Sequence, residues 1–418
     1  MTSRKSGEKF VVIGNGVAGY TAAYTIKQHR NEAQITMISK EPYPLYSACG
    51  LANYLAGEIP RETLFLEDLS CYEHLGILPR FGESVIRIDT QSRKVVLNEG
   101  IINYDKLILA TGSKALRPPI EGINHEGILA LKSIADADNI LKHDGSCVAV
   151  IGSGPIGIEA AIAIKRRGLE VFLIESMPRL LPRLFDQGPS RFVEDVLTEH
   201  GIKVFCGELV SHIFCKEKGM EVVTREREIS CDFIILAAGM VPNIEITEET
   251  GINIGVLNGI SVDDKMRTSV EGVYACGDCV ETWNVLTGRI CLSLLWHCAR
   301  QQGRIAGLNA SGIEARYPGS VNYTGVDLFG VPCVSLGVLE DEDHKISAVE
   351  KRGKDFLRRF LIKDNTLIGI QVIGDMDGIG VIANLVRRKV PFNKVLLRRE
   401  RDFVNFMGLS RADLINLE

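Results

Sequence analysis

The feature that most constrains this chain is a glycine motif that occurs twice, each time between an apolar run and a helix-like segment. The two copies read Gly14-Asn15-Gly16-Val17-Ala18-Gly19 and Gly152-Ser153-Gly154-Pro155-Ile156-Gly157. Glycines at these places permit a tight turn, a close approach of the backbone to a pyrophosphate, and packing of a helix on its strand. The N-terminus of that helix then faces the phosphates. The sequence therefore predicts two dinucleotide-binding units, about 138 residues apart.

The segments beside both motifs fit this prediction. Each motif follows a strand-like run and precedes a helix-like segment and a second strand: Phe10–Ile13, Tyr20–Gln28 and Gln34–Ile38 around the first, and Cys147–Ile151, Ile158–Arg167 and Val171–Ile174 around the second. This alternation is typical of parallel sheets with helices on both faces. The expected fold class is therefore α/β, with two Rossmann-like domains.

Composition narrows the class of protein further. The 418 residues provide for two to four domains, and the net charge of −5 argues against nucleic acid as the main ligand. The longest apolar runs fall far short of the ~20 residues of a membrane-spanning helix. No cleavable leader follows the basic N-terminus, so we expect a cytoplasmic protein without a membrane segment. The 11 cysteines, an odd number, indicate reduced thiols and no disulfide framework.

The pattern changes from about Gly319 onward. Strands are expected at Val334–Val338, Phe356–Ile362 and Leu367–Val372, and a helix at Asp377–Val386. These segments predict a third, α+β domain built on an antiparallel sheet. The final stretch, Lys394–Glu418, mixes arginines with apolar residues. It is interpreted either as a solvated helix or as a docking surface for an acidic partner.

One acidic residue bears on the choice of nucleotide. Glu175 closes the second strand of the second unit, where a carboxylate binds a ribose 2′-hydroxyl and repels a 2′-phosphate. It therefore favours NADH over NADPH, although Arg179 and Arg183 keep NADPH open, and a solvated strand end is the simpler alternative. In the first unit the corresponding acid, Glu41, is displaced by about two positions.

Three further segments identify a family. Leu109–Ser113 and Ala237–Asn243 each end a predicted strand, and Thr268–Asp278 ends in Cys-Gly-Asp. In this order, with both glycine motifs, they resemble the flavoprotein pyridine nucleotide–disulfide oxidoreductases of the glutathione reductase-like fold. The resemblance implies FAD in a discontinuous domain of residues 1–112 and 240–318, and NAD(P)H in residues 113–239. It also implies a C-terminal interface domain, residues 319–418, that forms a homodimer.

The resemblance also assigns residue roles. Asp278 should bind the flavin ribityl chain, and Glu159 should lie near the nicotinamide, unless it is only a helix-surface acid. Gln301–Gly307 resembles the helix whose N-terminus points at the flavin pyrimidine, and His297 before it is either a gate or a packed residue. The implied cofactor contacts are Gly14, Gly16, Ala18, Gly19, Glu41, Ala110, Thr111, Gly112, Gly152, Gly154, Ile156, Gly157, Glu175, Gly239, Gly277, Asp278, Trp296 and His297.

The position of one cysteine suggests a subgroup. Cys49, in Ser-Ala-Cys-Gly, resembles the redox cysteine of the single-cysteine group, which comprises NADH oxidases, NADH peroxidases and coenzyme A-disulfide or persulfide reductases. There one thiol cycles through a sulfenate or a mixed disulfide, and its thiolate is favoured at a helix N-terminus. Cys49 begins a helix-like run to Leu55; the alternative is a small apolar thiol that lines the flavin pocket. Val17 replaces the histidine that peroxidases and oxidases carry, which argues against peroxide chemistry.

A rival group is the rubredoxin and ferredoxin reductases, with the flavin part of nitrite reductases. Ile38–Pro42 and Tyr54–Gly57 resemble that group, but Ala52 and Asn53 stand where its lysine is expected. Two functions follow. The first is an FAD-dependent NAD(P)H oxidoreductase acting through Cys49 on a disulfide, a persulfide or oxygen; the alternative is a reductase of a small iron–sulfur protein. A redox sensor has no support, and the Cys276/Cys279 pair, which encloses Asp278, predicts no metal site.

Overall fold

The structure is a computed structural model that describes residues 7–339 and 346–391. The chain divides into two compact units, each assembled from three separate segments. Unit 1 comprises Met1–Ala48, Pro60–Lys114 and Met240–Ser320, and unit 2 comprises Cys49–Ile59, Ala115–Gly239 and Val321–Glu418. No helix within the described residues is both long enough and apolar enough to cross a bilayer.

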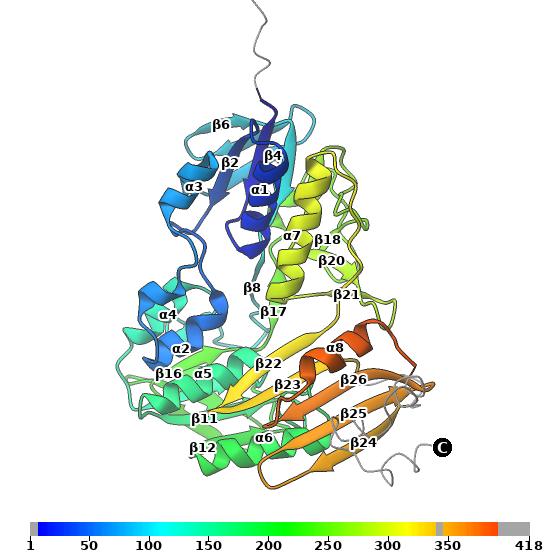
Figure 1. Cartoon of the computed structure of the whole chain (residues 1–418). Coiled ribbons are helices and arrows are strands. Elements are labelled where there is room, and N and C mark those ends of the chain that lie inside the picture. Colours follow the sequence, from blue (N-terminus) through cyan, green and yellow to red (C-terminus); the bar gives the residue numbers. More distant parts are fainter. Residues whose placement is uncertain (1–6, 340–345, 392–418) are drawn as a thin grey trace, which may run out of the picture. The chain divides into compact units, whose positions relative to one another are not determined.

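Unit 1 is built on a five-stranded parallel sheet (Figure 1). Its strands, in spatial order, are β19 (Val273–Ala275), β7 (Lys106–Leu109), β1 (Lys9–Ile13), β2 (Gln34–Ser39) and β3 (Ile77–Phe81). The central strand β1 is buried on both faces, and Val11 and Val12 have almost no exposed surface. Burial on both faces is the reason that this strand is a continuous apolar run without alternation.

Two helices of unit 1, α1 (Val17–His29) and α7 (Trp296–Ala310), lie side by side although they are far apart in sequence (Figure 1). Glycines in α7 make this contact possible. A Cβ on Gly303 would lie 2.2 Å from the carbonyl oxygen of Ala18, and one on Gly307 would lie 2.6 Å from that of Ala22. The backbones therefore touch directly where any side chain would separate them.

The rest of unit 1 is short strands and turns. Two three-stranded sheets are β4 (Val85–Asp89), β5 (Lys94–Leu97) and β6 (Gly100–Asn103), and β18 (Ile260–Ser261), β20 (Val280–Trp283) and β21 (Ile290–Leu292). The short helices are η2 (Arg61–Leu64), α3 (Leu69–Leu75) and η3 (Glu245–Thr247). The two strands that adjoin the boundary between the units, β8 (Ser113–Ala115) and β17 (Met240–Pro242), pair with each other.

Unit 2 contains a second five-stranded parallel sheet. Its strands, in spatial order, are β12 (Ile202–Cys206), β11 (Glu170–Glu175), β10 (Cys147–Ile151), β16 (Phe233–Leu236) and β9 (Ile128–Leu129). Beside it are α4 (Ile134–Leu141), α5 (Pro155–Arg166), α6 (Gln187–Glu199) and the sheet β13 (His212–Cys215), β14 (Met220–Val223) and β15 (Glu228–Cys231). The segment η1 (Ala48–Gly50) and α2 (Leu51–Ala56) leads into this unit, and α2 packs against α5.

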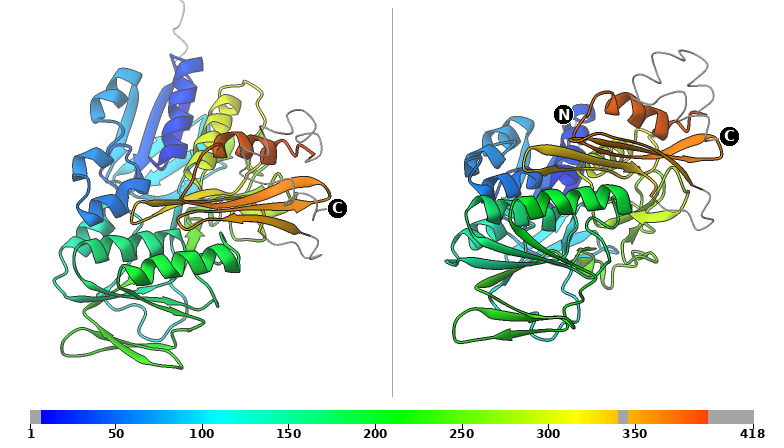
Figure 2. Two further views of the ribbon diagram at one scale, coloured as in Figure 1. Left: turned by 60° about the horizontal axis from the view of Figure 1, so that its bottom comes forward. Right: turned by 90° about the horizontal axis from the view of Figure 1, so that it is seen from below.

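The C-terminal part of unit 2 is a five-stranded antiparallel sheet between helices. Its strands are β22 (Tyr323–Leu328), β23 (Val331–Gly337), β26 (Thr366–Ile373), β25 (Leu357–Lys363) and β24 (Ser347–Arg352). Figure 2 shows α8 (Ile379–Arg387) on one face of this sheet and α6 on the other. The α/β class, with two Rossmann-like domains and a C-terminal α+β domain, is therefore confirmed.

Three details differ from the sequence expectations. The helix expected over Gln301–Gly307 begins earlier, at Trp296, and the C-terminal helix begins at Ile379 instead of Asp377. Cys49 is not the first residue of an α-helix: it lies in the 3-10 turn η1, and α2 begins at Leu51. The predicted segment Lys394–Glu418 lies outside the described residues.

Candidate active site

The first glycine loop forms a backbone cradle in unit 1. Gly14 has a φ of 108°, and a Cβ there would lie 2.0 Å from the carbonyl oxygen of Ala110. A Cβ on Gly19 would lie 2.0 Å from the carbonyl oxygen of Gly14, so both positions require glycine. Gly16, by contrast, faces open space and begins α1 without a side-chain cap. The first turn of α1 therefore presents backbone N–H groups beside open space, which suits a pyrophosphate.

The second glycine loop repeats this geometry in unit 2. Gly152 has a φ of 102°, and a Cβ there would lie 2.4 Å from the carbonyl oxygen of Ala237. A Cβ on Gly157 would lie 2.0 Å from the carbonyl oxygen of Gly152. Gly154 faces open space at the start of α5, again without a side-chain cap. The two sequence motifs therefore fold into the same kind of cradle, one in each unit.

Glu175 stabilises the second glycine loop through hydrogen bonds. Its carboxylate, which is buried, accepts hydrogen bonds from the backbone N–H of Ser153 (2.8 Å), the hydroxyl of Ser153 (2.6 Å) and the N–H of Met177 (2.8 Å). Arg179 donates to the carbonyl oxygens of Pro182 and Phe185. Glu175 thus lies at the loop as its place in the sequence predicted, and its contact with a ribose stays a prediction.

Asp278 lies between two other elements of unit 1. Its carboxylate accepts a hydrogen bond from the hydroxyl of Ser113 at 2.7 Å. Gly277 has a φ of 86°, and its N–H donates to Oε1 of Gln302 on α7 at 2.8 Å. A Cβ on Gly277 would lie 2.9 Å from Cβ of Ala18. The structure therefore brings Ala18, Gly277 and Asp278 together and adds Gln302, which the sequence analysis did not single out.

Hydrogen bonds also link the strand ends that carry other predicted cofactor contacts. The hydroxyl of Thr111 donates to the carbonyl oxygen of Asn243 at 2.6 Å, and the N–H of Asn243 donates to the carbonyl oxygen of Gly112 at 2.9 Å. Ala110 is buried beneath the first loop. Glu41 accepts a hydrogen bond from the Tyr46 hydroxyl at 2.8 Å. Gly239 lies in unit 2, where its carbonyl oxygen accepts from the N–H of Leu116.

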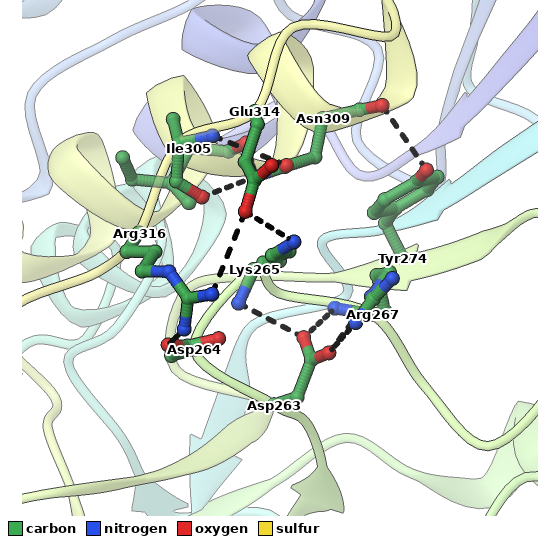
Figure 3. Close-up of polar contacts among 10 residues, drawn as sticks. Asp263, Asp264, Lys265, Arg267, Tyr274, Ile305, Asn309, Glu314 and Arg316 are labelled. Carbon is green, nitrogen blue, oxygen red and sulfur yellow. Dashed lines mark hydrogen bonds and ion pairs between the residues drawn. The ribbon is translucent and has the colours of Figure 1, made fainter.

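A polar cluster holds the far end of α7 (Figure 3). Tyr274 on β19 donates to the carbonyl oxygen of Asn309 at 3.1 Å, and Lys265 pairs with Glu314 at 2.6 Å. The cluster comprises Asp263, Asp264, Lys265, Arg267, Tyr274, Ile305, Asn309, Glu314 and Arg316. It connects the strand that leads to Asp278 with the end of α7, so both are fixed relative to each other within unit 1.

The first turn of α7 contains Trp296 and His297, both predicted contacts, and a thiol that was not among the predicted site residues. Cys298 is buried there. Burial acts to raise the pKa of this thiol, but the adjacent His297 outweighs it, and the pKa lies below its usual range. The adjacent histidine was the available signal in the sequence.

Most of the other cysteines are unsuited to redox chemistry. Burial raises the pKa of seven thiols, to about 11 for Cys147 and about 12 for Cys206, Cys231 and Cys333; the others are Cys276, Cys279 and Cys291. Thiols of this kind stay protonated and unreactive at neutral pH. Cys49 and Cys215 are the two exposed cysteines. The burial pattern therefore leaves Cys49 among the few accessible thiols.

Glu159 is the other predicted catalytic residue. It lies on α5, one turn after the second glycine loop, and is partly buried. Burial raises the pKa of its carboxyl to about 7, and the charge of Asp327 adds to the shift. Such a carboxyl changes its charge near neutral pH, as catalytic acids and bases do.

Comparison with known proteins identifies the family. The model of the pyridine nucleotide-disulphide oxidoreductases matches residues 8–303. An NADH oxidase of Methanocaldococcus jannaschii is 36% identical over 320 residues, which cover 73% of this chain and 71% of that protein. An NAD(P)H coenzyme A polysulfide/persulfide reductase of Pyrococcus horikoshii is 30% identical over 390 residues, 88% and 87% of the two chains. The structure of an NAD-dependent persulfide reductase from A. fulgidus matches with a TM-score of 0.88 at 29% identity, covering 93% of this chain and 78% of that one.

The chain belongs to the pyridine nucleotide-disulphide oxidoreductase family. It is an enzyme, an FAD-dependent NAD(P)H oxidoreductase, and its cofactors are FAD and NADH. The residues present fit both groups, because each glycine loop forms a cradle that a Cβ would fill and that opens at an uncapped helix start. FAD, when bound, takes up the hydride of the reduced nicotinamide, and the protein supplies orientation and electrostatics.

Proposed function

We propose that the chain carries electrons from NADH, through FAD, to a disulfide or persulfide substrate by way of the thiol of Cys49. In the last step a mixed disulfide between Cys49 and a substrate thiol takes up two electrons and one proton. The S–S bond breaks, the Cys49 thiolate is released and the substrate leaves as a thiol. Oxygen is the other acceptor that this scheme admits.

The observation that carries the proposal is the exposure of Cys49 in the turn before α2, while burial raises the pKa of seven of the other thiols. The similarity to a coenzyme A polysulfide/persulfide reductase supports the same substrate class. In this proposal, the first cradle, with Asp278, holds FAD, and the second, with Glu175, holds NADH. Glu159 lies beside the nicotinamide.

The test is the Cys49→Ser variant, with Cys215→Ser as the matched control, since Cys215 is the other exposed cysteine. Stopped-flow spectroscopy should show reduction of the flavin by NADH at a rate within about twofold of wild type in both variants. Turnover with coenzyme A disulfide or polysulfide should fall by about 100-fold or more in Cys49→Ser alone, because the covalent route is removed. Unchanged turnover with these acceptors would refute the role of Cys49; high turnover with rubredoxin instead would favour the iron–sulfur protein alternative.

The proposal includes a homodimer formed through residues 319–418. The C-terminal sheet β22-β23-β26-β25-β24 and α8 are the described part of this region. Sedimentation velocity of the FAD-loaded enzyme should give a mass of two chains. A single-chain mass at micromolar concentration would reject the dimer without affecting the assignment of the cofactors.

A further inference from the structure

The middle residues of the two glycine loops are fixed by different partners. In the second loop, Ser153 donates to the carboxylate of Glu175 at the end of β11. In the first loop the middle residue is Asn15, and its side-chain Nδ2 donates to the carbonyl oxygen of Tyr43 at 3.0 Å. The partner is a carboxylate in one loop and a backbone carbonyl in the other. The first loop is therefore linked directly to the segment that follows β2.

A buried phenol completes this link. Tyr72 on α3 has no exposed surface, and its hydroxyl lies 2.8 Å from Oδ1 of Asn15 and 3.0 Å from the backbone nitrogen of Leu45. A backbone N–H can only donate, so the phenol oxygen accepts from Leu45 and gives its single proton to Asn15. Burial raises the pKa of Tyr72 to about 12, so the hydroxyl keeps this proton at neutral pH. The hydrogen bonds thus run from Leu45 through Tyr72 and Asn15 to Tyr43, and both ends lie in the segment after β2.

The aromatic ring of Tyr72 is held independently of its hydroxyl. It makes edge-to-face contacts with Tyr20 on α1 and with Phe81 on β3, with ring centroids 5.5 and 5.2 Å apart. Such contacts depend on the rings and not on the hydroxyl. A phenylalanine at position 72 would therefore keep the packing and lose only the two hydrogen bonds. The role of the hydroxyl can be separated from that of the ring.

The hydrogen bonds of Tyr72 join two parts of the expected FAD site. Asn15 stands between Gly14 and Gly16, in the backbone cradle that opens at the start of α1. The segment after β2 contains Glu41, the predicted ribose contact, whose carboxylate accepts from the Tyr46 hydroxyl at 2.8 Å. All of these residues belong to unit 1. The link therefore fixes the cradle and the segment of Glu41 relative to each other.

We propose that Tyr72 is a positioning residue of the FAD site: through Asn15, its hydroxyl holds the first glycine loop and the segment of Glu41 in the arrangement that binds the adenosine diphosphate half of FAD. Because this arrangement exists before the cofactor binds, FAD does not have to order the two segments, and its affinity is higher. The inference rests on the proposed place of FAD at the first cradle.

The test is the Kd of the apoprotein for FAD in Tyr72→Phe, measured from the change in FAD fluorescence on binding. The Kd should rise about tenfold, because the loop and the segment after β2 must then be ordered by the cofactor. The visible spectrum of the bound flavin should match that of wild type, because Asp278 and the start of α7 are not altered. A merely structural role would lower the unfolding temperature and leave the Kd, measured well below that temperature, unchanged.

The second variant, Asn15→Ala, removes the same link from the side of the loop, where the residue is half-buried. It should raise the Kd for FAD by a similar factor, and it keeps the proposal testable if Tyr72→Phe does not fold. The double variant should bind FAD about as weakly as either single variant, since both changes break one link. Independent effects would multiply to about 100-fold and would overturn the coupling of Tyr72 to the loop.

The matched control is Tyr104→Phe. Tyr104 is also buried in unit 1, but its hydroxyl makes no hydrogen bond to any residue that the structure describes, so the Kd for FAD should stay within about twofold of wild type. Titration of the FAD-loaded variants with NAD⁺ should give the wild-type affinity. Wild-type binding of both FAD and NAD⁺ in Tyr72→Phe and Asn15→Ala would overturn the role of Tyr72 alone. Weaker binding of NAD⁺ with unchanged binding of FAD would show that the first cradle holds NADH, and so would overturn that part of the proposed function.

Discussion

At the scale of single residues, two glycines of the second loop should fail in different ways when a methyl group is added. In Gly157→Ala the Cβ would meet the Gly152 carbonyl oxygen at 2.0 Å, so the loop must move, and we expect a loss of about 1–3 kcal/mol in folding stability. Gly154 faces open space, so Gly154→Ala should cost less than about 1 kcal/mol. It should nevertheless weaken NADH binding by about tenfold or more, because the methyl group occupies the approach of the pyrophosphate.

Urea unfolding and NADH titration of the two variants check this prediction. Flavin content serves as the control, since the first cradle is not altered. If Gly154→Ala kept wild-type affinity for NADH, the second loop would not bind the pyrophosphate through its backbone.

The glycines of the two cradles were predictable from sequence, because the backbone conformation that requires glycine there is set within a short segment of the chain. A positive φ at Gly14 or a close backbone contact at Gly19 follows from a turn of six residues. The raised pKa of Glu159 was not predictable, because its burial on α5 depends in part on how a distant strand, β22, packs against that helix. The adjacent His297 was the available sequence signal for the lowered pKa of the Cys298 thiol, but the burial of that thiol depends on how α7 packs.

At the scale of elements, the contact between α1 and α7 should be intolerant of a residue that favours helices. Gly303→Ala gains about 1 kcal/mol of helix propensity. The new Cβ would, however, lie 2.2 Å from the carbonyl oxygen of Ala18. Separating the two helices should therefore lower the folding stability by about 1–3 kcal/mol more than the gain in helix propensity raises it. The expected result is a less stable protein that loses flavin more readily, since α1 begins at the first cradle.

The matched control is Gly380→Ala, in a helix where the added Cβ meets nothing within 4 Å. It should be neutral or stabilising by up to about 1 kcal/mol. Thermal unfolding followed by circular dichroism and by flavin release compares the two. A Gly303→Ala variant as stable as Gly380→Ala would contradict the close packing of α1 and α7.

The bounds of helices and strands were predicted well where a clear sequence signal, such as a glycine turn, marks the end of the element. They were predicted poorly where such a signal is missing. The strand β10 has the predicted bounds, because an apolar run ends there at a glycine turn. The start of α7 was missed by five residues: Leu295 gives no side-chain cap, and Trp296, His297 and Cys298 are not typical first-turn residues. For α2, a 3-10 turn precedes six helical residues, and periodicity cannot separate such short pieces.

At the scale of the whole molecule, each unit holds one glycine cradle, although each is assembled from three segments of the chain. The sequence predicted the doubled module. It gave no indication that Cys49–Ile59 is grouped with unit 2, since that grouping arises from the packing of α2 against α5. If both cofactor assignments are right, each ligand should stabilise its own unit most strongly, because binding to a folded site stabilises the elements that form it.

Hydrogen exchange measured by mass spectrometry checks this in the FAD-loaded enzyme with and without NAD⁺. At a ligand concentration of about 100 times the Kd, binding contributes about 2.7 kcal/mol, so amides that exchange only when the site opens should slow by about 100-fold. We expect this protection in β10, the loop at Gly154 and the start of α5, whereas amides of β1 and the loop at Gly16 should change by less than about threefold. The apoprotein with FAD added should show the reverse pattern. If NAD⁺ protected the Gly16 loop and left the Gly154 loop unprotected, the assignments of FAD and NADH to the two loops would have to be exchanged. Such a result is conceivable in geometry, because the two cradles have the same backbone form and differ only in the residues around them.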